Sequence, residues 1–296
     1  MMKKIKGLVT VALSARNARE TIVRAVNSIL GQTYESIELF VVDDASDDGM
    51  SAVLRENVKD PRLSVIVLDR NIGTYAAKNL VLKDFARGEF FAHQDADDFS
   101  HAARFMAQIA FLREHPDCAV CGTAIDEFYS DSAFRPKFST ETTAFLSPED
   151  GYYHRHNIYP LSVTESDVLS LRAVIDLKLA MNGSLMFRTD LLEDIGGFDG
   201  HTFVGADTDM LMRMALIYAV SNLPDILYSR FFHGASLTGS VGTGFGSDLR
   251  SRYALQMEMW RERVRGLCRQ KDRAVLKEAV LRECFFPASV RYSVFK

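Results

Sequence analysis

The feature that most constrains this chain is the alternation of apolar and amphipathic stretches over its first 95 residues. Continuous apolar runs of strand length occupy residues 8–13, 37–42 and 63–68, and a fourth begins at Phe90. Helical spacing of apolar residues between these runs predicts helices at 22–30, 50–57 and 74–85. Strands that are apolar on both faces are buried on both sides, and their alternation with helices predicts right-handed crossovers and a parallel sheet. The expected fold is an α/β, Rossmann-type sheet with helices on both faces.

Composition sets the class of protein. The chain has 296 residues, 47% of them hydrophobic and 25% charged, which suits one large globular domain or one domain with an appendage. The net charge of -4 argues against nucleic acid as the main partner. No apolar run approaches the roughly 20 residues of a membrane-spanning helix, and the basic start of the chain lacks the apolar core of a signal peptide. We therefore expect a cytoplasmic protein.

The four cysteines are too few and too scattered for a disulfide framework. Cys118 and Cys121 have the spacing of a metal or redox pair, but no second pair or nearby histidine completes a zinc site. Their apolar setting is typical of a buried strand, so core thiols are the favoured interpretation.

Polar residues gather where three of the predicted strands end: Ser14 to Asn17, Asp43 with Asp44, and Asp95 to Asp98. The carboxyl ends of parallel strands meet at one edge of a sheet, so these groups should share a crevice. Asp95 and Asp97 point the same way in an extended segment, whereas Asp98 points back toward the protein. Such oxygen ligands suit Mg²⁺ or Mn²⁺. The alternative is a solvated acidic turn or a helix N-cap.

Four segments together resemble the family 2 glycosyltransferases with a GT-A fold. They span roughly residues 8 to 240 and read VTVALSARNARETIVRAVNSILGQTYESIELFVVDDASDDG, DRNIGTYAAKNLVLKDFARGEFFAHQDADDFS, NGSLMFRTDLLEDIGGFDGHTFVGADTDMLMRMA and RFFHGASLTGS. The resemblance implies an inverting transferase that uses a nucleotide-diphosphate sugar and a divalent cation, Mn²⁺ or Mg²⁺. The Gly-rich phosphate motifs of other nucleotide-binding folds are missing from this sequence.

The resemblance also implies roles for individual residues. Asp44 matches the family residue that binds the nucleobase or ribose, and Lys78 lies where a basic residue approaches the diphosphate. Asp95 and Asp97 match the D-x-D motif, with Asp95 toward the ribose and Asp97 on the metal. Before Asn17, Ser14-Ala15-Arg16 replaces the usual Pro-Thr-Tyr of the family. The full nucleotide-sugar set is Ser14, Ala15, Asn17, Asp43, Asp44, Asn71, Gly73, Lys78, Asp95 and Ala96.

Inverting transfer needs a carboxylate to take the proton of the acceptor hydroxyl. Asp207 matches the second residue of the family's acidic pair, the usual base, while Ala206 replaces the first. The helix that is expected to follow places Asp207 and Asp209 in its first turn, where the helix dipole favours acids, and Asp209 is the reserve candidate. His233 falls where family members place a histidine near the metal, beside Asp97.

The predicted organisation has two parts. Residues 1–245 form the GT-A domain, with a nucleotide-sugar half (1–129) and an acceptor-side half (130–245) that carries an insertion near 130–180. Residues 246–296 form a basic helical extension that braces the domain or, alternatively, touches an anionic membrane surface as a peripheral contact. Within the acceptor-side half, Thr189 is expected to cap a helix at 190–195.

The predicted function is inverting, metal-dependent hexosyl or N-acetylhexosaminyl transfer from a UDP-sugar. The acceptor would be a hydroxyl of a glycan or lipid-linked molecule in bacterial surface polysaccharide synthesis. Two alternatives stay open. A nucleotidyltransferase would need a Gly-rich basic loop after the first strand, and residues 14–19 contain no glycine. A non-catalytic sugar-nucleotide-binding module is compatible with Ala206 and the altered first loop.

Overall fold

The structure is a computed structural model. It describes residues 3–129, 145–149, 152–157, 162–163, 182–233, 242–244, 247–268, 273–281 and 290–296. For the three short segments between 145 and 163, only the backbone is described.

The first half of the sheet is parallel, as the alternating pattern predicts. It contains β1 (Ile5–Ala15), β2 (Ile37–Asp43), β3 (Leu63–Leu68) and β4 (Gly88–Asp95). These strands stand in the order β3-β2-β1-β4 and all run the same way. The chain passes outward from β1 to β3 and then returns to the other side of β1, so strand order reverses between β1 and β4. Ligands of such sheets bind beyond the strand ends at that reversal.

The second half of the sheet mixes directions. Strand β10 (Met186–Arg188) lies between β4 and β6 (Cys118–Tyr129) and is antiparallel to both. Strand β11 (Ala219–Phe232) runs parallel to β6 and pairs at its far edge with β5 (Phe99–Ser100). Cys118 and Cys121 are buried thiols in β6, which confirms the core interpretation.

Part of the predicted insertion near 130–180 forms short strands: β7 (Phe145–Glu149), β8 (Tyr152–Asn157) and β9 (Ser162–Val163). Strand β8 pairs with β6 and β7, while β9 pairs with β11. The rest of the insertion lies outside the described residues, as do the side chains of these three strands.

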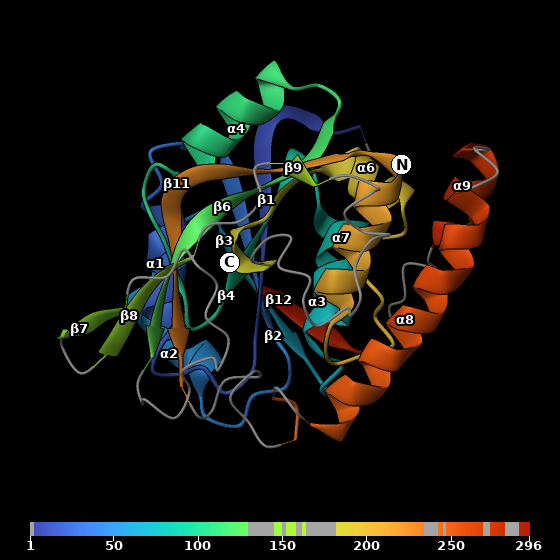
Figure 1. Cartoon of the computed structure of the whole chain (residues 1–296). Coiled ribbons are helices and arrows are strands. Elements are labelled where there is room, and N and C mark those ends of the chain that lie inside the picture. The colour runs from blue at the N-terminus through green and yellow to red at the C-terminus, as the bar shows by residue number, and fades with distance from the viewer. Residues whose placement is uncertain are drawn as a thin grey trace.

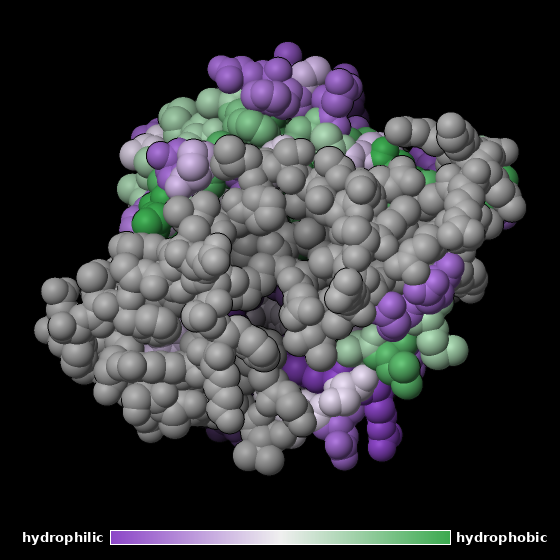
Figure 2. Space-filling model, in the orientation of Figure 1, coloured by the Kyte–Doolittle hydropathy of each residue, from purple (hydrophilic) through white to green (hydrophobic). Residues whose placement is uncertain are grey.

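Helices cover both faces of the sheet (Figure 1). One face carries α1 (Ile22–Leu30), α2 (Met50–Asn57) and α4 (Arg104–Glu114), whose apolar residues pack against Val11 and Leu13 of β1. Figure 2 shows both hydrophilic and hydrophobic surface over α4, and Met106 of this helix is 47% exposed. The apolar sides of α1 and α2 thus face the sheet, whereas α4 buries Arg104 and Gln108 along with apolar residues.

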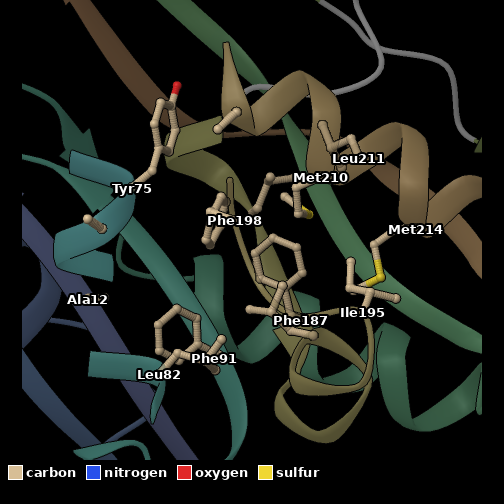
Figure 3. Close-up of a cluster of buried hydrophobic side chains, with 14 of the residues drawn as sticks. Ala12, Tyr75, Leu82, Phe91, Phe187, Ile195, Phe198, Met210, Leu211 and Met214 are labelled. Carbon is tan, nitrogen blue, oxygen red and sulfur yellow. The ribbon is translucent and has the colours of Figure 1, made fainter. Parts of the chain in front are cut away.

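The opposite face carries α3 (Thr74–Leu80), α6 (Thr189–Asp194) and α7 (Ala206–Ile217). Figure 3 shows the apolar cluster there, in which rings from β4, β10 and the segment before α7 meet the methionines of α7. The helix predicted at 74–85 changes form within that span, since α3 ends at Leu80 and a π-helical turn, η1 (Val81–Phe85), completes it.

The C-terminal extension contains α8 (Asp248–Cys268) and α9 (Arg273–Val280) and then an unexpected strand, β12 (Tyr292–Phe295). Strand β12 pairs antiparallel with β3 and forms the sheet edge, so the prediction of an entirely helical extension is wrong. Trp260 and Val280 are buried in the same apolar cluster as α7, so the extension does brace the domain. Among the described helices, none is both long and apolar enough to cross a membrane.

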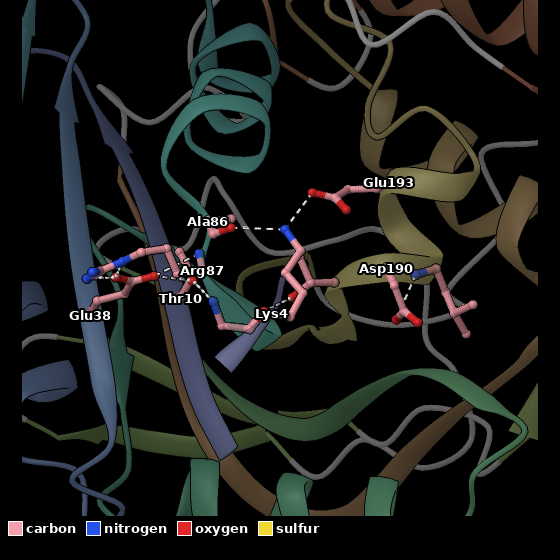
Figure 4. Close-up of polar contacts among 10 residues, drawn as sticks. Lys4, Thr10, Glu38, Ala86, Arg87, Asp190 and Glu193 are labelled. Atoms are coloured by element: carbon pink, nitrogen blue, oxygen red, sulfur yellow. Dashed lines mark hydrogen bonds and ion pairs between the residues drawn. The ribbon is translucent and has the colours of Figure 1, made fainter. Parts of the chain in front are cut away.

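Charge pairs hold the amino-terminal ends of the strands (Figure 4). Lys4 Nζ donates to the Ala86 carbonyl at 2.9 Å and to Glu193 Oε1 at 2.7 Å, which ties the start of the chain to α6. Glu38, buried in β2, accepts from Thr10 and from the Arg87 guanidinium. These bonds lie at the edge of the sheet opposite the carboxyl ends, which leaves the carboxyl ends to form a site.

The predicted cap of α6 is wrong. Thr189 is the first residue of the helix, not its cap, and no side chain makes a capping hydrogen bond there. The Thr189 hydroxyl donates instead to the Gly88 carbonyl at 2.7 Å. A tertiary hydrogen bond across to the start of β4 has therefore replaced the local one.

Candidate functional site

The polar strand ends do converge. In the register of the sheet, Ser14 lies beside Asp95 of β4, and Ala15 lies beside Asp43 of β2. The Ala15 carbonyl also accepts from the Asp44 backbone N–H at 2.8 Å. Residues that are about 80 positions apart in sequence thus meet at the edge where strand order reverses.

Asp43 and Asp44 are only 3% exposed and hold the loops of this edge together. Asp43 accepts from the Ser46 N–H at 2.9 Å and from the Ser51 hydroxyl. Asp44 accepts from the N–H groups of Ile72 and Gly73, at 2.7 and 2.9 Å. Burial raises the pKa of Asp44, and these two N–H donors oppose the rise. The predicted nucleobase contact therefore has both oxygens engaged by the Asn71-Ile72-Gly73 loop.

Two asparagines shape the same loops. Asn71 Oδ1 accepts from the Gly73 N–H at 2.9 Å, and Gly73 has a φ of 86°, a conformation that a residue with a side chain rarely adopts. Asn17 has a φ of 53°, and its side-chain oxygen accepts from the Asp47 N–H at 3.0 Å. Both predicted nucleotide-binding loops are thus rigid turns held by side-chain oxygens.

Two of the three acids in the turn after β4 remain partly exposed. The side chains of Asp95 and Asp97 are 29% and 26% exposed, whereas Asp98 is only 2% exposed. Asp98 accepts from the Tyr228 hydroxyl at 2.8 Å and from the Phe231 N–H at 2.9 Å. Burial, with the nearby charges of Asp97 and Asp95, raises the pKa of Asp98. The turn therefore concentrates negative charge, with two carboxylates facing outward.

The donor atoms at Asp97 fit a divalent cation. Asp97 Oδ2 lies 2.9 Å from His233 Nε2, and this hydrogen bond is the main reason that the pKa of His233 is raised. The carboxylate oxygen of Asp97 suits Mn²⁺ or Mg²⁺, and the imidazole nitrogen of His233 can act as a ligand once it is deprotonated. The described residues contain no cluster of three or more acidic, histidine or cysteine side chains arranged to hold a metal. Substrate phosphates and water would have to complete the coordination.

Lys78 is buried beneath this turn, with 1% of its surface exposed. Its Nζ lies 3.6 Å from Asp95 Oδ1 and has no hydrogen-bond partner in the described structure. A buried ammonium group with an incomplete shell is a ready contact for a phosphate group. The adjacent Asn79 binds backbone instead: its side-chain NH₂ donates to the Phe198 carbonyl, and its side-chain oxygen accepts from the Phe198 N–H.

Arg104 of α4 binds the backbone near the end of β4. It is fully buried and donates to the His93 carbonyl, the Ser100 hydroxyl and the Leu185 carbonyl at 3.0, 2.7 and 3.2 Å. Burial lowers the pKa of Arg104 to about 10, which leaves it charged at neutral pH. The strand end and the segment before β10 are thus joined through one guanidinium group.

Asp207 lies in the first turn of α7, as predicted, and is half-buried. Its Oδ1 accepts from the Tyr75 hydroxyl at 2.9 Å. Asp209, the reserve base, is fully buried and paired with Arg213 at 2.8 Å, so no acceptor can reach it. Ala206 is also fully buried.

Several residues of the site could not be recognised in the sequence. Tyr75 and Tyr228 look like core aromatics in sequence, and both are buried, yet their hydroxyl groups bond to Asp207 and Asp98. Arg24 of α1 donates to the Asp97 carbonyl at 2.5 Å. No local pattern marks these residues, because each partner is more than 70 positions away.

Comparison with known proteins identifies the class. Residues 10–172, more than half of the chain, match the model of the family described as glycosyl transferase family 2. The chain belongs to glycosyl transferase family 2.

Curated relatives of this chain include named bacterial glycosyltransferases. The putative teichuronic acid biosynthesis glycosyltransferase TuaG of Bacillus subtilis is 33% identical over 138 residues, 46% of this chain and 54% of TuaG. The Escherichia coli UDP-Glc:alpha-D-GlcNAc-diphosphoundecaprenol beta-1,3-glucosyltransferase WfaP is 34% identical over 105 residues, 36% of this chain and 41% of WfaP. The matched stretches thus span about half the length of these relatives.

Among solved structures, TarS 1-349 of S. aureus in complex with UDP-GlcNAc is similar, with a TM-score of 0.56 at 22% sequence identity. The similarity covers 77% of this chain and 60% of that one. It confirms the predicted mixed α/β, GT-A-like fold.

Proposed function

We propose that this chain is an inverting, metal-dependent glycosyltransferase that moves a hexosyl or N-acetylhexosaminyl group from a UDP-sugar to a hydroxyl acceptor. One observation supports the proposal: two partly exposed acids, Asp95 and Asp207, both lie near the buried Tyr75. The buried Tyr75 hydroxyl is bonded to Asp207 and lies within electrostatic range of Asp95 as well. Family membership supports the same activity over a nucleotidyltransferase.

The donor would lie along the carboxyl ends of β1, β2 and β4. Ser14 and Asp95 are neighbours in the sheet and would flank the ribose, while the Asn17 and Asn71 turns would enclose the base. Asp44 would act mainly through the backbone that it holds, since both its oxygens already accept N–H groups. Lys78 Nζ would gain diphosphate oxygens in place of its incomplete contacts.

Asp97 and His233 would hold Mn²⁺ or Mg²⁺, which supplies electrostatic stabilisation of the departing diphosphate. Lys78 adds a fixed positive charge on the same side of the turn. Arg24 and Tyr228 keep the turn in place through the Asp97 carbonyl and the Asp98 carboxylate. The two metal ligands would therefore be positioned before substrate arrives.

Asp207 would take the proton of the acceptor hydroxyl as that oxygen forms its bond to the anomeric carbon. The bond from that carbon to the diphosphate breaks on the opposite face, which inverts the configuration. Asp207 is half-buried, so one of its oxygens can face an acceptor while Tyr75 engages the other.

The acceptor is proposed to be a glycan or a lipid-linked sugar in bacterial surface polysaccharide synthesis, the setting that the name of TuaG states for that relative. Exposed Leu255 and Met259 lie one helical turn apart on α8, and the nearby Arg252 is exposed as well. An apolar stripe with a basic neighbour is what a helix resting on an anionic membrane surface presents. Peripheral membrane contact through α8, at the cytoplasmic face, is part of this proposal.

The test is donor binding and turnover with a panel of nucleotide sugars in Mn²⁺ or Mg²⁺. Asp97→Ala should abolish metal-dependent donor binding. Asp207→Asn should keep donor binding but lower kcat by about 10²- to 10⁴-fold, the usual contribution of a general base. The matched control is Asp190→Asn, an exposed acid in the first turn of α6, which should leave both unchanged.

Two results would contradict the proposed glycosyltransferase activity. Absence of binding for every nucleotide sugar with either metal would remove the transferase assignment. Binding without turnover in the unmodified chain, with an acceptor that a related enzyme uses, would favour the non-catalytic sugar-nucleotide-binding module.

A further inference from the structure

Tyr75 is the one side chain of the nucleotide-sugar half that makes a hydrogen bond to Asp207 among the described residues. Its ring is 4% exposed and stacks on Phe198 with centroids 5.9 Å apart. Figure 3 shows the ring against the apolar cluster, with its oxygen pointing away from that cluster. The hydroxyl donates to Asp207 Oδ1 at 2.9 Å. A rigid, packed ring therefore holds one oxygen of the carboxylate.

The Tyr75 hydroxyl keeps its proton and donates it in the hydrogen bond to Asp207. Burial, followed by the nearby charge of Asp207 and the hydrogen bond to it, raises the pKa of Tyr75 well above its ordinary value. The phenol therefore stays protonated at any pH at which the protein would work. A permanent donor on Oδ1 fixes the rotamer of Asp207 and leaves Oδ2 as the oxygen that can accept a proton.

The start of α3, which carries Tyr75, also lies beside the proposed site of the sugar donor. Tyr75 follows Gly73 by two residues, and the Gly73 N–H is bonded to Asp44. On the next part of the turn, Lys78 Nζ lies 5.9 Å from the Tyr75 ring centre and faces Asp95. One short segment, from the Gly73 loop to Lys78, therefore carries contacts to both Asp207 and the acids of the proposed donor site.

We propose that Tyr75 is the positioning residue for Asp207 and that its hydroxyl sets the orientation of the base. This inference rests on the proposed role of Asp207 as base. It adds a residue from the nucleotide-sugar half to the acceptor side of the reaction, so that the base is correctly oriented only when the start of α3 is in place.

The other charged and titratable groups around this pair come from four elements. Arg250 and Tyr253 of α8 lie within electrostatic range of both Tyr75 and Asp207. Asp95 of β4 faces Tyr75, and Lys78 lies on α3 itself. Asp209, on the same turn of α7 as Asp207, is neutralised by its pairing with Arg213. To the charges of these groups the Tyr75 hydroxyl adds a direct hydrogen bond to the Asp207 carboxylate.

The experiment compares Tyr75→Phe with the unmodified chain over a range of pH. Phenylalanine keeps the stacked ring and removes only the hydroxyl. Losing a hydrogen bond to a charged group should lower kcat by about tenfold to hundredfold, with KM for the donor within about twofold. The acidic limb of the kcat profile should move to higher pH, because a carboxylate without its donor takes up a proton more readily.

Tyr218→Phe is the matched control. Tyr218 also donates its hydroxyl to an aspartate, Asp194, but at the end of α7 away from the site. Both variants lose one Tyr to Asp hydrogen bond, so a purely structural role would leave the pH profile unchanged in both. A kcat and a pH profile for Tyr75→Phe equal to those of Tyr218→Phe would overturn the inference.

A second variant covers the case in which Tyr75→Phe fails to fold. Incorporation of 3,5-difluorotyrosine at position 75 preserves the ring and makes the hydroxyl a stronger donor, so the acidic limb should move to lower pH. An unmoved limb would reject the positioning role. Activity retained in Asp207→Asn would instead remove the proposed base, which separates failure of that role from failure of the inference about Tyr75.

Discussion

The carboxylates at the functional edge fall into two groups of the same chemistry with opposite environments. We call Asp43, Asp44 and Asp98 the buried group, each no more than 3% exposed and bonded to backbone N–H groups or hydroxyls. We call Asp95, Asp97 and Asp207 the open group, which are partly exposed. The difference teaches that acids gathered at one edge have different tasks: three of them hold the loops together, while the other three keep part of their surface open to solvent.

The largest expected effect comes from disturbing both groups at once. A Cβ on Gly183 would overlap the Tyr228 hydroxyl and stand 2.9 Å from Asp95 Oδ2. Tyr228 bonds the buried Asp98, so Gly183→Ala should displace one acid of each group. We expect kcat/KM to fall by about 100-fold or more, in line with the sensitivity of reaction rates to small misplacements.

The control for that change is Gly242→Ala, since a Cβ there meets nothing within 4 Å. Steady-state kinetics with the best donor would measure both variants. Equal activity of the two would mean that Tyr228 and Asp95 are not held as tightly as the structure indicates.

Much of the fold could be predicted because its signals are local. The apolar runs that became β1 to β4 and the spacing that became α1 and α2 lie within short windows. The predicted bounds of β2, β3, α1 and α2 agree with the structure within one residue, whereas β1 and β4 begin two or three residues earlier than predicted. Strand β12 could not be predicted, since its residues are partly exposed and pair with β3 more than 220 positions away. Long-range pairing of this kind leaves no periodic pattern in sequence.

The residues of the site also divide into those that the sequence could identify and those that it could not. The motif positions of Asp95, Asp97 and Asp207 came from a resemblance, and the structure places Asp95 and Asp207 near the same side chain, Tyr75. The sequence could not show that both oxygens of Asp44 accept hydrogen bonds from the Gly73 loop or that the Tyr75 hydroxyl bonds to Asp207. Such roles depend on side-chain packing between distant elements and not on spacing.

A second prediction concerns a single member of the buried group. Asp44→Asn replaces one acceptor oxygen by an NH₂ group that would face a backbone N–H, donor against donor. The fold should lose about 1–3 kcal/mol, the usual cost of an unsatisfied buried polar group, and donor binding should weaken with the loop. Urea unfolding and a donor titration would measure the two effects. A variant as stable as the unmodified chain would show that the Gly73 loop holds without this acid.

A third prediction concerns how the free energy of unfolding depends on pH through His93, a buried residue of β4. His93 is fully buried among aromatic rings, and burial followed by the charge of Lys78 lowers its pKa well below the ordinary value. The folded state keeps His93 neutral, while the unfolded chain takes up a proton near pH 6.5. Stability from this residue is therefore complete above that pH and is lost as pH falls, by up to about 1.4 kcal/mol per pH unit.

Urea unfolding from about pH 8 to about pH 5, on either side of the ordinary histidine pKa, would measure this slope. His93→Gln should flatten it, whereas His115→Gln, at an exposed histidine, should not. An unchanged slope in His93→Gln would assign the pH dependence to other groups.

The smallest expected effect comes from an acid outside both groups. Asp60 accepts from Arg62 Nη2 at 2.7 Å near the surface, and the side-chain hydrogen bonds from Arg62 lower the pKa of Asp60 below its ordinary 3.8. This contribution to stability is present above that value and disappears as pH falls through the folded pKa. Asp60→Asn should therefore cost less than about 1 kcal/mol at neutral pH and nothing at pH below the folded pKa. A cost at neutral pH equal to that of Asp44→Asn would mean that a shell of backbone donors does not distinguish the buried group from an ordinary surface ion pair.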